Sequence, residues 1–258
     1  MKPRSPLALV FALGLAACPA WAAESFDGFV ERVSADWVRH DPQTATNKQY
    51  FSGAEQDALD RQLTAEDDVI NLPIEPGQRQ AALELAQRIL AELRTYDRAT
   101  LTPVQRTAAG VLESRLQQLV EAIPFADHWF VFNQFRGLQV TLVSFLTETH
   151  PIRHRRDIEN YLVRLAQVGP LLDLGLAEAR ARAEKNLIPP RFILTATLRQ
   201  IDGFMVGEPA ANVLVASLAE RAAKVKDLSA ADRATFVAEA ERMVRTAVLP
   251  AYGRIRDL

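Results

Sequence analysis

The sequence predicts an all-α protein, a multi-helix bundle of long antiparallel helices. Apolar residues recur three and four positions apart over most of residues 26–258, which is the period of a helix with one buried face. Helix start signals precede several of these stretches, most clearly at Thr102-Pro103 and at Ser229. No repeat of fixed period and no low-complexity segment interrupts the pattern. Residues 23–258 are therefore expected to form a single helical domain.

Residues 1–22 have the features of a secretory signal peptide. Lys2 and Arg4 give a basic start, residues 7–17 are apolar, and Ala20-Trp21-Ala22 offers a cleavage site. The apolar run is shorter than the roughly 20 residues that a helix needs to cross a bilayer. We therefore expect export with cleavage, a periplasmic or secreted protein, and no membrane span.

A lipid anchor at Cys18 is the alternative, because residues 15–18 (LAAC) resemble a lipobox. Pro19 directly after the cysteine disfavours lipidation, so an outer-membrane lipoprotein is the second choice. Cys18 is also the only cysteine, so a mature chain would have no disulfide, thiolate metal site or cysteine nucleophile. The chain has a formal net charge of −2 and lacks the basic footprint of nucleic-acid binding.

The first part of the mature chain predicts two helices and two irregular segments. Residues 26–40 form a helix with a stripe that includes Phe29 and Trp37, and Asp41-Pro42 ends it. Residues 44–53 are turn-like and receive no regular structure. A short helix over 55–63 follows, and residues 71–77, with two prolines and a glycine, form a connector.

Two long helices with a short link come next and are expected to pack antiparallel. The first covers residues 78–96. The second starts with the best local signal in the chain: Thr102 as cap, Pro103 at the first position and Gln105 to complete a capping box. Its buried stripe is predicted to be Val104, Ala108, Val111, Leu112, Leu119 and Ile123.

Helices are predicted for the rest of the chain. Residues 137–149 should be helical, with a strand as the alternative because of their β-branched residues. Gly169-Pro170 is expected either to kink the chain or to break it. The remaining predicted helices cover residues 152–168, 171–185, 191–205, 212–225 and 229–248. After Pro250 an apolar face continues to Leu258 without a cap, which indicates either a domain cut short or a terminal helix docked on the core.

His150 and His154 have the spacing of a helix-borne zinc pair, but their surroundings disfavour zinc. A residue before proline is pushed out of the helical region, so Pro151 should place His150 outside the helix of His154. No glutamate follows His150 to act as the base of an H-E-x-x-H site. Positive charge around His154 opposes a dication. We interpret the pair as a helix-entry turn, with His150 or Thr149 as the cap.

That positive charge comes from Arg153, Arg155 and Arg156. Cations in the first turn of a helix oppose its dipole, so they need acidic partners. Glu148, Asp157 and Glu159 are near enough in sequence to supply some. A solvated surface is the favoured interpretation. The functional alternative is a patch that docks an acidic surface or a substrate carboxylate, made of His150, Arg153 and His154.

Asn133, Gln134 and Arg136 place amides and a cation inside apolar sequence. Buried polar groups must be paired, so they are expected to tie a loop to the helical core, with the lining of a substrate channel as the sharper hypothesis. No G-x-S-x-G, phosphate-binding glycine loop or H-E-x-x-H stretch occurs. We predict no catalytic and no metal-binding residue in this chain.

Several stretches together resemble the bacterial family called domain of unknown function 885, whose fold is similar to the helical gluzincin zinc peptidases. They are residues 44–53, 60–64, 132–137, 147–153, 157–162, 189–194 and 248–252. The order and spacing of these stretches agree with the family over nearly the whole mature chain.

The resemblance implies the N-terminal half of a longer domain. Family members are about twice this length, and their zinc-binding stretch, H-E-A-x-P-G-H-H, lies in the C-terminal half. None of it is present here, so zinc is expected only in full-length relatives and this chain is expected to be inactive alone. The implied partners are a peptide or the missing C-terminal half. A non-enzymatic helical binding module is the rival hypothesis.

Overall fold

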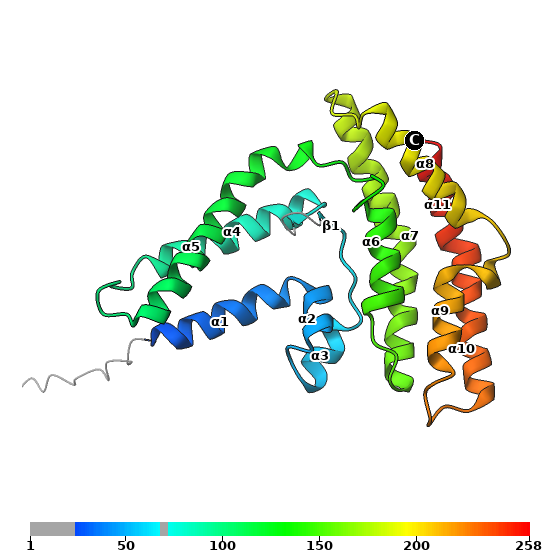
Figure 1. Ribbon diagram of the computed structural model, residues 1–258, viewed down its shortest axis with the longest axis horizontal. Helices are drawn as coiled ribbons and strands as arrows, with labels where there is room; N and C mark the ends of the chain where they lie inside the picture. The colour runs from blue at the N-terminus through cyan, green and yellow to red at the C-terminus, as the bar shows by residue number, and fades with distance from the viewer. Residues whose placement is uncertain (1–23, 68–71) are drawn as a thin grey trace, which may run out of the picture.

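Helices dominate the structure, a computed structural model that describes residues 24–67 and 72–258. The protein is all-α, as predicted, apart from a two-residue antiparallel ladder between β1 (Glu66–Asp67) and β2 (Leu72–Pro73). The predicted signal peptide and the alternative lipid site at Cys18 lie outside the described residues. Figure 1 shows two groups of helices side by side, with α2, α3 and β1 between them.

The N-terminal group consists of α1 (Phe26–Arg39), α4 (Pro76–Leu93) and α5 (Pro103–Ala122). These helices share one hydrophobic core. The predicted capping box of α5 is present: the Thr102 side chain accepts from the Gln105 amide at 3.3 Å, and Gln105 Oε1 accepts from the Thr102 amide at 3.0 Å. The antiparallel partner of α5 is α4, as expected.

The predicted buried stripe of α5 is wrong in part. Val104 is 78% exposed, Val111 is 59% exposed, and Ala108 is also exposed. Leu119 is buried, as predicted, and the other buried residues of α5 are Ala109 and Leu116. The reason is that α5 has apolar residues on two faces, and α4 covers only one of them.

Residues 42–48 form a helix, α2 (Pro42–Lys48), where a turn-like segment was expected. Asp41-Pro42 ends α1, but it also starts α2: Asp41 Oδ1 accepts from the Thr44 amide at 2.8 Å, and Pro42 occupies the first turn. Gln49 ends the helix in a left-handed conformation with φ 47°. The next helix, α3 (Gly53–Leu59), confirms the short helix that was predicted over 55–63, with shifted ends.

The C-terminal group forms the larger core. Its helices are α6 (Leu138–Ser144), α7 (Arg155–Glu184), α8 (Arg191–Met205), α9 (Val213–Ala222), α10 (Ala230–Met243) and α11 (Leu249–Arg256). The central helix is α7, which runs for 30 residues and continues through Pro170, so Gly169-Pro170 does not break it. Gly169 gives space for a neighbour, because a Cβ there would lie 3.3 Å from the Ala247 carbonyl oxygen.

Irregular turns complete this group. One π-helical turn follows α6 (Phe145–Thr149), and another joins α10 to α11 (Val244–Val248); 3-10 turns cover Ile123–His128 and Pro209–Ala211. The helical prediction for residues 137–149 is confirmed over the strand alternative. Tyr252 and Ile255 are buried, and α11 packs against α7 and α8. In the described part of the chain, no helix is long and apolar enough to cross a membrane.

Candidate functional site

Arg164 of α7 is fully buried and bonds to the segment that lies between the two groups of helices. Its Nε donates to the Gln62 carbonyl oxygen at 2.8 Å, and its Nη2 donates to the Leu59 carbonyl oxygen at 3.0 Å. The same Nη2 donates to Thr46 Oγ1 at 2.6 Å. A planar guanidinium suits this role because it can donate in several fixed directions at once. The side chain therefore ties α7 to the α2–α3 segment.

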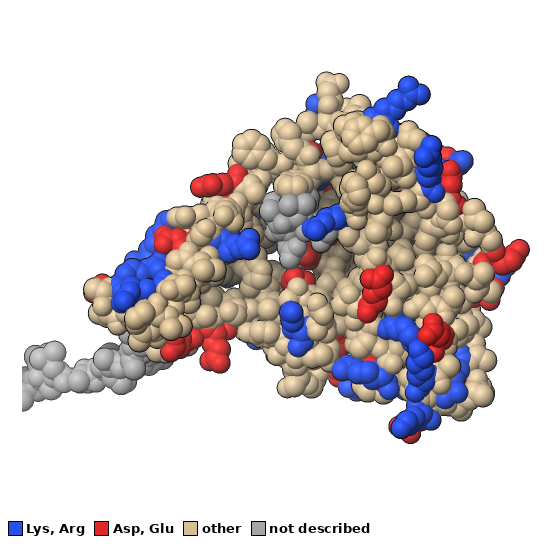
Figure 2. Space-filling model, in the orientation of Figure 1, with Lys and Arg blue, Asp and Glu red and all other residues tan. Residues whose placement is uncertain are grey.

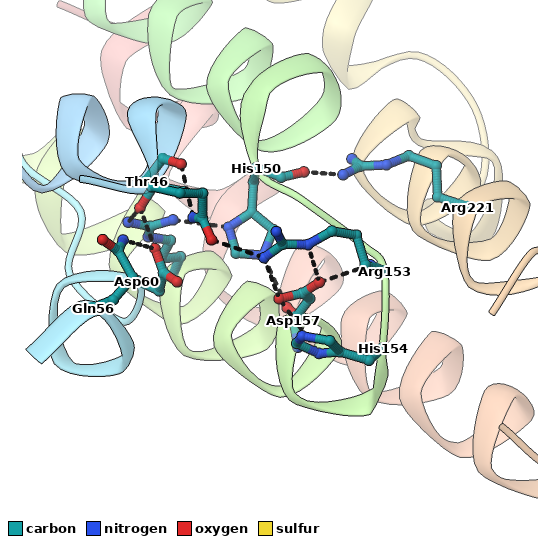
Figure 3. Close-up of polar contacts among 10 residues, drawn as sticks. Thr46, Gln56, Asp60, His150, Arg153, His154, Asp157 and Arg221 are labelled. Carbon is teal, nitrogen blue, oxygen red and sulfur yellow. Dashed lines mark hydrogen bonds and ion pairs between the residues drawn. The ribbon is translucent and has the colours of Figure 1, made fainter. Parts of the chain in front are cut away.

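The buried charge of Arg164 is compensated through Thr46. The Thr46 hydroxyl donates to Asp60 Oδ1 at 2.6 Å, and Gln56 Nε2 donates to the same oxygen at 2.9 Å (Figure 3). Burial lowers the pKa of Arg164 to about 10, and nearby Asp60 acts in the opposite direction. The guanidinium therefore remains charged at neutral pH. This cluster is a shared buried polar network rather than a free reactive group.

His150 belongs to the same network and has both ring nitrogens occupied. Arg164 Nη1 lies 2.8 Å from Nδ1, so Nδ1 accepts, and Nε2 donates to the Asp157 carbonyl oxygen at 2.9 Å. These partners select the neutral imidazole with the proton on Nε2. Burial, opposed by the Asp157 hydrogen bond and reinforced by Arg164 and Arg221, lowers the pKa of His150 to about 4. The ring is a structural linker in this arrangement.

His154 lies outside that network, at the start of α7. It is the N-cap residue, with Nδ1 at 3.4 Å from the Asp157 amide, and its side chain is 58% exposed. The sequence placed His150 or Thr149 at this cap; the structure gives the role to His154, because Pro151 delays the helix start to Arg155. His150 does lie outside the helix that begins after His154, as its position before Pro151 predicts.

The arginines around His154 all have acidic partners. Arg153 pairs with the buried Asp157 at 3.1 Å, and Arg155 pairs with Glu159 at 3.0 Å, which confirms two of the partners expected from the sequence. Two more partners come from distant segments: Asp232 lies 3.1 Å from Arg155, and Asp57 pairs with Arg156. These arginines therefore have the acidic partners that cations in the first turn of a helix need.

Arg221 of α9 caps the carbonyl groups at the end of the π-helical turn. Its Nη1 donates to the Leu146 carbonyl oxygen at 2.9 Å and the Thr147 carbonyl oxygen at 3.0 Å, and its Nη2 donates to the His150 carbonyl oxygen (Figure 3). The last carbonyl groups of a helix lack partners within it, and a cation there is favourable. The turn that carries His150 is thereby fixed from two sides.

The loop at Asn133 is held by its own side chain. Asn133 Oδ1 accepts from the Phe135 amide at 3.0 Å and the Arg136 amide at 2.8 Å. Gln139 Nε2 donates to the Asn133 carbonyl oxygen at 2.7 Å, and Gln200 of α8 donates to the Gln134 carbonyl oxygen at 2.8 Å. These bonds tie the loop to α6 and α8, as the sequence predicted.

This loop borders two neighbouring cavities between the two groups of helices, which we call the central hollow. Their volumes are about 310 Å³ and about 500 Å³, and both are lined by Glu66, Phe135 and Arg136. Charged side chains are scattered over the face in Figure 2, and the surface is hollowed between the two groups. Further lining comes from Asp41, Gln43, Thr64, Thr141, Ser144 and Thr149.

Glu66 is the unusual titratable group of the hollow. Burial, together with the charge of Asp41, raises the pKa of its carboxyl to about 8, although Thr64 donates to Glu66 Oε1 at 2.6 Å and acts against the shift. Glu66 is therefore mostly protonated at neutral pH and can donate a hydrogen bond. Phe135 is 78% exposed and presents an open phenyl ring to the same space.

The candidate site residues from the sequence thus lie in two separate regions of the structure. Asn133 and Arg136 line the central hollow, with Gln134 beside them, whereas His150, Arg153 and His154 gather at the start of α7. Arg164, Asp60, Glu66 and Phe135 were missed. A signal for Arg164 was present, because Asp157, Asn160 and Arg164 recur at helical spacing and form a polar stripe on a buried helix.

No metal centre is found in the part of the chain that the structure describes, where no three His, Cys, Asp or Glu side chains are placed to hold an ion. Fold and site define an all-α domain with a polar hollow between two helical groups. The chain belongs to a family described as bacterial protein of unknown function (DUF885), whose model matches residues 54–258. No curated protein matches it.

A solved structure shares the fold. It is the crystal structure of a "putative lipoprotein" from Colwellia psychrerythraea, with a TM-score of 0.67 and 17% sequence identity. The match covers 90% of this chain and 40% of that chain. This chain therefore spans less than half the length of the solved relative, and the likeness at this identity concerns the fold alone.

Proposed function

We propose that this domain is the ligand-binding wall of a zinc-peptidase-like protein of the cell envelope. In this proposal it holds an extended peptide in the central hollow and supplies no catalytic group of its own. The observation that carries the proposal is the lining of the hollow, which combines hydroxyl and amide side chains with the exposed ring of Phe135. The family match and the greater length of the solved relative support it.

The chemistry of the lining suits a peptide. Thr141 and Ser144 offer donors and acceptors for main-chain N–H and C=O groups, and protonated Glu66 adds a donor. Phe135 offers an apolar contact for one side chain of the ligand. Such sites combine apolar area with a few placed polar groups. In a full-length relative, zinc would polarise the peptide carbonyl and activate water, and this domain would position the peptide.

The test is retention of peptides by the purified chain. A tryptic digest of casein is dialysed against the protein, and retained peptides are identified by mass spectrometry. We expect retention of a subset, reduced about tenfold by Phe135→Ala, which removes an exposed ring at little cost to the fold. Phe125→Ala is the matched control, because Phe125 is 62% exposed and lies outside the hollow. Equal retention by both variants, or none by the native chain, would contradict the proposal.

A non-enzymatic binding module is the second candidate. The structural roles of two histidines favour it over an enzyme. Both ring nitrogens of His150 are in structural hydrogen bonds, and His154 caps α7. Both candidates expect peptide retention, and they differ in one measurement. A full-length family member should show chelator-sensitive peptidase activity under the first proposal and none under the second.

A further inference from the structure

A separate cavity of about 490 Å³ lies between α1, α4 and α5, away from the central hollow. One of its walls, α1, precedes residues 54–258, the part matched by the family model. Most of the lining is apolar, and it consists of Val33, Trp37, Val38, Ile89, Leu112, Leu116 and Leu119, with Ser34, Arg115 and Gln118 as polar members. The function proposed above does not use this cavity.

The cavity exists because α1 and α5 diverge. They meet near their starts, where Gln105 Nε2 donates to Asp27 Oδ1 at 2.9 Å. The rings of Phe26 and Phe29 pack there on Tyr96, with centroids 5.5 Å and 5.1 Å away. From this closed end the two helices separate towards the end of α1 (Figure 1). The space between α1 and α5 is therefore a wedge, which these contacts close at its narrow end and which is open at its wide end.

The floor and the rim of the wedge differ in chemistry. Val33, Ile89 and Leu116 are buried at the floor, whereas Trp37 and Leu112 are only half-buried and leave apolar surface towards the opening. Arg115 is exposed at the rim. Within the described residues no hydrogen bond or ion pair engages Arg115, whereas the guanidinium of Arg106 on the same helix donates to the Leu101 carbonyl oxygen. An apolar slot with one available cation at its mouth fits a molecule with an apolar body and one anionic end.

We propose that this cavity binds a fatty acid, with the alkyl chain between Trp37 and the leucines of α5 and the carboxylate at Arg115. The alkyl chain would cover apolar surface that is otherwise exposed to water, which is favourable by about 25 cal/mol per Å². A peptide fits less well, because the walls offer few partners for its main-chain polar groups. The single cation selects a monocarboxylate over a neutral lipid.

Trp37 reports directly on occupancy. Titration of the purified chain with dodecanoate below its micelle concentration should shift the tryptophan emission to the blue and saturate, and Trp37→Phe should abolish the signal. Arg115→Gln should weaken dodecanoate binding about fivefold, the value of one exposed charge contact, and leave dodecanol binding unchanged. Arg88→Gln, which removes an exposed charge from α4 outside the cavity, should have no effect.

Ser34→Phe adds a ring at the half-buried mouth and should remove binding while the melting temperature stays close to that of the native chain. Isothermal calorimetry then gives a second reading that does not depend on Trp37. The proposal is overturned if dodecanoate does not saturate, if Ser34→Phe still binds it, or if dodecanol binds as tightly and Arg115→Gln changes nothing. None of these results bears on peptide retention in the central hollow.

Discussion

At the residue scale the buried network at the start of α7 depends on one titratable group. His150 accepts from a guanidinium on one side and donates to a carbonyl on the other, so its protonation would place two cations in contact. In the unfolded chain the ring takes a proton below about pH 6.5, and in the folded chain only near pH 4. The unfolded state therefore binds more protons between these values, and stability falls as the pH falls.

The expected size of this effect can be measured. Between pH 7 and pH 5 the His150 contribution should lower the free energy of unfolding by about 2 kcal/mol. His150→Gln cannot titrate, so the difference between its urea unfolding curves at the two pH values should be smaller by that amount. Other groups titrate equally in both proteins and cancel. An identical pH dependence in both would show that His150 is accessible to protons when folded.

Arg164 is the second residue whose removal has a defined consequence. Arg164→Met leaves the Leu59 and Gln62 carbonyl groups and Thr46 Oγ1 without their cationic donor, and removal of one member of a buried charged network costs about 3–5 kcal/mol. Chemical denaturation should show this loss. Arg156→Met is the control, because Arg156 is exposed and its pair with Asp57 should contribute less than about 1 kcal/mol. Similar losses in both variants would refute the structural role of Arg164.

The same residues show which parts of the site could be predicted. The acidic partners Asp157 and Glu159 follow from local spacing, so the sequence was sufficient to predict them. The tie of the Asn133 loop to the core was predicted in kind, but its partner Gln200 lies 66 residues from Gln134 and could not be named. The environment of His150 was not predictable, because its partner Arg164 is 14 residues away and the network needs the α2–α3 segment. Contacts that join distant segments leave no local pattern.

At the scale of elements the sequence was most informative where start signals were strong. Thr102 and Ser229 begin helices as predicted, because a cap bonds only to its own first turn. The α2 helix was not predicted because Asp41-Pro42 can either end one helix or begin the next, and here it does both. The face of α5 was assigned wrongly in part because apolar residues on two faces leave the choice to the neighbouring helix.

The start of α6 gives a prediction for an element. A Cβ on Gly137 would lie 2.3 Å from the Asn133 amide nitrogen and 2.6 Å from the Asn133 carbonyl oxygen, and neither backbone atom can move without opening the loop. Gly137→Ala should therefore destabilise the fold by about 2 kcal/mol or more, as other strained core substitutions do. Gly110→Ala, inside α5 with nothing within 4 Å, should instead stabilise by about 0.5–1 kcal/mol. Thermal unfolding separates the two, and equal shifts would contradict the packing around Asn133.

At the scale of the whole molecule the two hydrophobic cores are distinct. Leu93 is fully buried in the core of α1, α4 and α5, and Leu165 is fully buried in the larger core around α7. The segment between them adds Leu63, Ala65 and Ile74 to the larger core, and it makes polar bonds to α7 through Arg164. Two cores joined in this way are expected to unfold locally and partly independently of each other.

Hydrogen exchange can test this independence. Leu93→Ala and Leu165→Ala should each cost about 2–5 kcal/mol through lost burial and a cavity. We expect Leu93→Ala to reduce amide protection in α1, α4 and α5 while α7 and α10 keep theirs, and Leu165→Ala to do the reverse. A uniform loss of protection from either variant would show one cooperative unit.

The contacts of Arg164 also affect how this family can vary in sequence. Two of its links to the preceding segment end on the main-chain oxygens of Leu59 and Gln62, which every amino acid carries. Replacement of those side chains leaves the acceptors in place, so point changes there are tolerated as far as packing allows. An inserted or deleted residue between Leu59 and Gln62 would move both acceptors out of register with a rigid guanidinium. The segment should therefore be variable in identity but fixed in length.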